Sequence, residues 1–214
     1  MNKRYCLHTV AALAMLFIAI TMRAQSPATG QILGHGYVDL GLSVMWATCN
    51  IGANSPSDYG DYFAWGEAET KAEYTEENSA TQGKSDNFID AASANWGSAW
   101  RMPTLEECRE LVDKDNCKWK WVTVGGHTGY MVKSKKNGNT IFLPAAGKHG
   151  GLAVVLCPIG ECGEYWSSSL GVSGGGPCVI MFSSDMLGGV GWASHYDGRG
   201  LPIRPVLERK CSTP

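Results

Sequence analysis

The chain has no excess of basic residues. It contains 18 lysines and arginines against 20 aspartates and glutamates, which gives a formal net charge of −2. Proteins that bind nucleic acid normally carry a basic face, so a nucleic-acid partner is not expected. The sequence also lacks a CxxC pair, an HExxH motif and a His/Cys cluster with zinc-finger spacing. We therefore expect no metal and no other cofactor.

Long apolar runs are absent except for one at the N-terminus. Val10–Met22 is almost wholly apolar, follows Lys3 and Arg4, and ends just before the small residue Ala24. This layout is typical of a secretory signal peptide covering residues 1–24. The run is short for a membrane span of about 20 residues, although a retained anchor is the alternative. We expect export to the extracellular space or the cell-envelope surface, with no stable membrane span after cleavage.

Removal of the signal peptide would leave 190 of the 214 residues, with 15 basic and 20 acidic side chains. That length suits one domain with a sizeable core. No repeat period and no interdomain linker is visible. We divide the mature chain into a short N-terminal segment (25–36), one domain (37–206) and a C-terminal tail (207–214).

Seven of the eight cysteines lie beyond the signal peptide. Disulfides are the default in an exported protein, and an odd number leaves at least one thiol free or paired between molecules. Cys157 and Cys162 are the best candidates for a local disulfide, because the four residues between them can turn back. Cys108 falls on the apolar face of an expected helix and is predicted to be a buried free thiol.

The clearest helix signal lies at residues 104–112. Pro103 disfavours helix before it, and Thr104 with Glu107 forms a capping-box pattern. Apolar residues then recur on one face, which predicts a helix of about three turns. The segment 86–96 gives a weaker helix signal.

The remaining elements are expected to be strands and loops. Alternation at 38–44 predicts one half-buried strand, and a short strand is expected at 62–65. Asn137-Gly138 predicts a tight hairpin between the runs at 128–134 and 139–147. A second hairpin is expected between 177–184 and 189–194, and 201–206 is predicted to be a closing edge strand. Residues 67–87 are polar and acidic and are expected to form a surface excursion. The fold class predicted is α+β, with antiparallel strands.

Several chemical patterns favour structural interpretations over catalytic ones. Residues 171–175 match GxSxG, but no strand–helix context surrounds them, so we predict a glycine-rich loop. Calcium could bind the carboxylate oxygens of Asp58, Asp61, Glu67 and Glu69, yet these residues lack the spacing of a known calcium loop. The scattered histidines are expected to be exposed loop residues. Most of the eight tryptophans are expected to be core material.

Seven segments in order carry a family resemblance: YVDLGLSVMWATCNIGA, DYGDYFAWGE, NWGSAWRMPTLEE, CKWKWV, IFLPAAG, EYWSSS and GRGLPIRPV. Together they resemble the Fibrobacter succinogenes major paralogous domain family. The resemblance implies a C-type-lectin-like fold, with a curled antiparallel sheet, one or two flanking helices and long loops. The family has no firmly established activity. The EPN, QPD and WND motifs of calcium-dependent lectins are absent, and active-site residues of formylglycine-generating enzymes have no match.

These observations favour an exported, non-enzymatic module that binds a glycan or a protein at the cell surface. A structural surface or appendage subunit is the alternative, followed by an exported enzyme of the formylglycine-generating type or a glycan hydrolase. Loops between the late strands of the resembled fold serve recognition, and here they span 171–200. The candidate ligand-binding residues are Trp192, His195, Tyr196, Asp197 and Arg199. A structural alternative is that Asp197 pairs with Arg199 or Arg204 and fixes the last strand.

Overall fold

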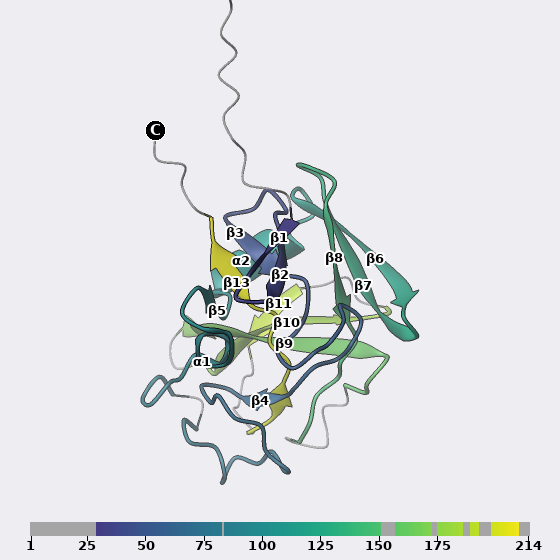
Figure 1. Cartoon of the computed structure of the whole chain (residues 1–214). Helices are drawn as coiled ribbons and strands as arrows, with labels where there is room; N and C mark the ends of the chain where they lie inside the picture. The colour runs from purple at the N-terminus through teal and green to yellow at the C-terminus, as the bar shows by residue number, and fades with distance from the viewer. Residues whose placement is uncertain are drawn as a thin grey trace, which may run out of the picture.

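The computed structural model describes residues 29–82, 84–150, 157–172, 175–185, 189–192 and 198–209, with the backbone alone for 189–192. The expected signal peptide lies outside these residues. The described part is mostly antiparallel β-sheet with two short helices (Figure 1). The elements are β1 (Thr29–Ile32), β2 (His35–Val38), β3 (Val44–Ala47), β4 (Phe63–Ala64), α1 (Ala91–Trp96), β5 (Trp100–Arg101), α2 (Leu105–Val112), β6 (Cys117–Val124), β7 (His127–Ser134), β8 (Thr140–Pro144), β9 (Cys162–Leu170), β10 (Pro177–Ser183), β11 (Gly189–Trp192), β12 (Gly200–Leu201) and β13 (Val206–Glu208).

The largest sheet has five strands in the order β1-β2-β3-β13-β5 and joins the two ends of the described chain. β13 pairs with β3 on one side and with β5 on the other. The expectation that residues 201–206 form a closing edge strand is therefore wrong. Val206 and Leu207 are 0% and 3% exposed, so their burial favours a central position over an edge.

The single strand expected at 38–44 is in fact two strands joined by a turn. β2 ends at Val38, β3 begins at Val44, and Gly41 between them has a φ of +73°. The alternating residues Val38, Leu40, Leu42 and Val44 are all buried, as their apolar character predicts. The pattern thus identified the core residues correctly, but a glycine with positive φ turns the chain between them.

Three smaller sheets complete the fold: β6-β7-β8, β11-β10-β9 and β12-β4. Both expected hairpins are confirmed, because β7 pairs with β8 and β10 pairs with β11, each antiparallel. The first turn is longer than a two-residue turn. Gly138 has a φ of +80° whereas Asn137 keeps a negative φ, and Asn137 instead donates its side-chain amide to the Asp39 carbonyl at 2.9 Å.

The capping box predicted at Thr104 is present and starts α2. The Glu107 amide donates to Thr104 Oγ1 at 3.3 Å, and the Thr104 amide donates to Glu107 Oε2 at 2.8 Å. Burial alone raises the pKa of Glu107, but hydrogen bonds from Arg101 and Thr104 outweigh it and hold the pKa below its usual range. The helix has eight residues, which is shorter than expected, because Asp113 turns extended at its C-terminus. α1 confirms the second half of the weaker helix signal at 86–96, because the helix begins only after its N-cap, Asp90.

The tryptophans lie mainly in the core, as expected. Trp46, Trp65, Trp96, Trp100 and Trp166 are buried, and Trp119 and Trp121 are half-buried against Tyr130 and Phe182. Trp192 is excepted, since its side chain lies outside the described residues. Within those residues, no helix is both long and apolar enough to cross a membrane.

Candidate functional site

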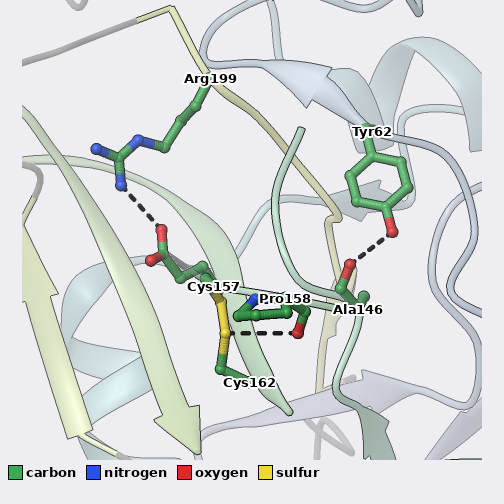
Figure 2. Close-up of a disulfide and its surroundings, with 7 residues drawn as sticks. Tyr62, Ala146, Cys157, Pro158, Cys162 and Arg199 are labelled. Atoms are coloured by element: carbon green, nitrogen blue, oxygen red, sulfur yellow. Dashed lines mark hydrogen bonds and ion pairs between the residues drawn. A yellow bond between two sulfur atoms is a disulfide. The ribbon is translucent and has the colours of Figure 1, made fainter. Parts of the chain in front are cut away.

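The structure describes only part of the predicted ligand-binding set. Arg199 is 9% exposed, and its Nη1 forms an ion pair with Glu164 Oε2 at 3.0 Å (Figure 2). The backbone of Trp192 ends β11, opposite Cys178 of β10. His195, Tyr196 and Asp197 lie outside the described residues. The five-residue site therefore stays a prediction, and within it the Arg199 side chain is held by a buried carboxylate.

Four segments meet around Arg199, and we call this region the loop end: residues 62–76, 146–149, 157–164 and 198–200. The amide of His149 donates to the Gly200 carbonyl at 3.0 Å, and the amide of Gly200 donates back at 2.8 Å. Gly198 has a φ of +70°, and a Cβ there would lie 2.0 Å from the Thr75 backbone. Only glycine allows so close an approach in this conformation. The acidic excursion therefore packs directly on the end of the late loop.

Three aromatic rings contact one another at the loop end. The rings of Tyr62 and His149 lie 3.9 Å apart between centroids, tilted by 33°, and Tyr74 meets His149 edge-on at 6.4 Å. His149 is exposed, Tyr62 is half-buried and Tyr74 is buried. Their polar atoms fix the backbone. Tyr62 donates to the Ala146 carbonyl at 2.6 Å (Figure 2), and Tyr74 donates to the Tyr62 carbonyl. The result is a braced ring pair in which His149 is the exposed member.

The predicted disulfide is present within the loop end. Cys157 and Cys162 are bonded, with their Cα atoms 5.4 Å apart (Figure 2). The connection between them turns back as expected, because the amides of Glu161 and Cys162 both donate to the Pro158 carbonyl. Cys162 begins β9, two residues before Glu164, so the bridge fixes the strand that carries the partner of Arg199.

We expect peptide mapping without reduction to recover Cys157 and Cys162 in one cross-linked peptide and Cys108 as a free thiol. Cys108 is 0% exposed, and burial raises its pKa well above the usual value, so alkylation should require unfolding. Replacing both bridge cysteines by serine should lower the free energy of unfolding by about 2 kcal/mol, because the closed loop is short. Alkylation of Cys157 and Cys162 in the native, unreduced protein would contradict the assignment.

The aromatic part of the loop end was not identified from the sequence. His149 is exposed, as expected of the histidines, but its stacking on Tyr62 joins residues 87 positions apart along the chain. His35 contradicts the expectation, because it is half-buried in β2 and stacks on Trp96 at 3.8 Å. The signal available was a tyrosine or histidine beside a glycine-rich turn, a pattern too common to indicate a site.

The loop end presents aromatic surface in which the Tyr62 hydroxyl is already hydrogen-bonded. Burial raises the pKa of the Tyr62 hydroxyl well above its usual value, and that hydroxyl is already engaged as a donor. Exposed aromatic faces can stack on apolar faces of a ligand such as a sugar ring. Among the described residues, no group of three or more His, Cys, Asp or Glu is placed to hold a metal ion.

GxSxG at 171–175 lies in the connection between β9 and β10, two antiparallel strands. The amide of Gly171 donates to the Gly176 carbonyl at 3.0 Å, and that of Gly175 donates to the Val172 carbonyl at 3.1 Å. Ser173 itself lies outside the described residues. The described part of the motif agrees with the prediction of a glycine-rich loop, because it connects two strands instead of a strand and a helix.

Comparison with models of known protein families, with curated proteins and with solved structures finds no match for this chain.

Proposed function

We propose that this protein is an exported, non-enzymatic binding module of the Fibrobacter succinogenes major paralogous domain family, with a C-type-lectin-like fold. The ordered sequence segments support the family proposal, together with a sheet that joins both ends of the domain and two short helices beside it. The ligand proposed is a glycan or a protein at the cell surface. A second role, as a structural surface subunit, would instead show as self-association of the purified protein.

The observation that carries this proposal is the exposed His149 ring, which stacks on the half-buried ring of Tyr62. Both residues are held by contacts that reach far along the chain, His149 to Gly200 and Tyr62 to Ala146. A rigid aromatic surface loses little conformational entropy when it contacts a ligand, which favours its use in recognition. Gly198, which follows Asp197 in the sequence, lies against the Thr75 backbone in this region of the chain.

The test is binding of the purified protein to a glycan and surface-protein array. We expect His149→Ala to weaken the strongest signal by about tenfold with little change in thermal stability, because the exposed imidazole supplies contact area. Tyr62→Phe is the matched control, since it keeps the ring and removes only the hydroxyl that donates to Ala146. Trp192→Ala and Asp197→Ala test the predicted set in the same way.

Two outcomes would overturn the assignment. The first is the absence of any array signal from the wild-type protein at micromolar concentration. The second is loss of binding in Tyr62→Phe and His149→Ala only in proportion to a loss of folded protein. In that case the rings are part of the framework, and the loop end is not a recognition surface.

A further inference from the structure

We propose that a second surface, on the outer face of β6 and β7, binds an anionic polysaccharide. We call it the lysine face and define it by Lys118, Lys120 and Lys133. The pairing register places Lys118 directly opposite Lys133, and Lys120 follows two residues further along β6 on the same face. All three side chains are exposed. This surface is separate from the loop end and does not depend on its function.

The register divides the β6-β7-β8 sheet into two distinct faces. The inner face carries the half-buried Trp119 and Trp121 opposite the buried Val132 and Tyr130. The outer face carries the lysines, then half-buried Val122 and Met131. Phe142 of β8, opposite Met131, is 4% exposed, and His127 at the far end of the hairpin meets Tyr59 at 4.5 Å, so this face is covered beyond the lysines. The exposed lysines thus adjoin a half-buried apolar strip.

Like charges directly opposite each other on a sheet destabilise it, so the Lys118–Lys133 pair is unfavourable in the isolated protein. In the described part of the chain, none of the three lysines forms an ion pair with an acidic side chain, whereas neighbouring Lys136 approaches Glu110 at 3.9 Å. Cross-strand neighbours lie about 5 Å apart and alternate residues along a strand about 7 Å apart. An anionic polymer would remove this repulsion and contact several ammonium groups together.

The charge distribution of the chain supports a local basic surface on an otherwise acidic protein. Residues 114–148 contain seven lysines and one acidic residue, Asp115, whereas residues 58–90 contain nine acidic residues and two lysines. In Figure 1, β6, β7 and β8 stand together away from β4 and the loops around it. The choice of a polysaccharide rests on the export proposed above, because an exported protein meets anionic polymers mainly as polysaccharides. The apolar strip of Val122 and Met131 suits the less polar faces of sugar rings.

The experiment measures binding of polygalacturonate, dextran sulfate, neutral dextran and a short DNA duplex at low and physiological salt. We expect both acidic polysaccharides to bind, neutral dextran not to bind, and affinity to fall as salt rises, because exposed charges are screened. Lys118→Glu should weaken binding by about tenfold, since it removes one cation and introduces a repelling carboxylate. The same variant should raise the melting temperature by about 1–3 °C, because it converts a Lys–Lys pair into a Glu–Lys pair.

Lys84→Glu is the matched control. It changes the net charge by the same amount at an exposed position in the acidic excursion, and binding should remain within about twofold of wild type. Equal losses in the two variants would show that net charge, not the lysine face, governs binding. Absence of polysaccharide binding, equal binding of neutral dextran, or tighter binding of the DNA duplex would each overturn the proposal.

Discussion

Replacement of Arg204 by methionine is expected to lower the free energy of unfolding by about 3 kcal/mol. Arg204 is 1% exposed, and it donates from Nε to Asn50 Oδ1 at 2.8 Å and from Nη1 to the carbonyls of Ala47 and Thr48 at 3.2 and 3.1 Å. Methionine fills a comparable volume but donates nothing. Buried acceptors would lose their partners, and each such loss costs about 1–3 kcal/mol.

The cost of burying the Arg204 charge opposes the stabilisation by its hydrogen bonds. Burial lowers the pKa of Arg204, which reflects the cost of placing a cation in the interior, and in the described residues no carboxylate pairs with it. Methionine removes that cost, so the net loss is smaller than the sum of three hydrogen bonds. The loss of hydrogen bonds should still outweigh the removal of this cost. Asn50 also donates to the Tyr165 hydroxyl, and burial raises the pKa of that hydroxyl to about 12, so it stays neutral.

Urea unfolding of Arg204→Met and of the control Arg109→Met measures the free energy of unfolding that each variant loses. Arg109 is 53% exposed and pairs with Glu106 across one helical turn, so its replacement should change stability by less than about 0.5 kcal/mol. An Arg204→Met variant that is as stable as the wild-type protein would mean that the cost of the buried charge equals the benefit of its hydrogen bonds.

The parts of this structure that the sequence predicted are those determined by local interactions. The capping box of α2 joins Thr104 to Glu107, three residues away, and the disulfide joins cysteines five residues apart. The hairpins likewise connect neighbouring segments. In each case the interaction and its signal lie within one short window of sequence, where residue type restricts the backbone directly.

The parts that were missed depend on contacts between distant segments. β13 takes a central place because it inserts between β3 and β5, about 160 and 105 residues earlier in the chain. Arg204 bonds to Asn50, and His149 stacks on Tyr62, with no feature of either local sequence to indicate the partner. Arg199 was predicted as a ligand-binding residue on the chemistry of its side chain, whereas its burial beside Glu164 depends on the fold.

The ion pair of Arg199 and Glu164 leads to the second large effect. Glu164 is 6% exposed and lies on β9, so Arg199→Met would leave a buried carboxylate without this partner. Breaking a buried pair from one side typically costs about 3–5 kcal/mol, and we expect a loss in that range. Replacing both residues together, as Glu164→Met with Arg199→Met, removes the stranded charge and should recover at least half of the loss.

The comparison of Arg199→Met with the double variant also separates a framework role of Arg199 from ligand contact. In a framework role, stability falls in Arg199→Met and recovers in the double variant, and array binding follows the folded fraction in both proteins. In a ligand-contacting role, binding is lost in both variants, including the double variant that has regained stability. We expect the framework outcome, because an arginine that is 9% exposed and held at 3.0 Å by a buried carboxylate has little of its guanidinium surface left for a ligand.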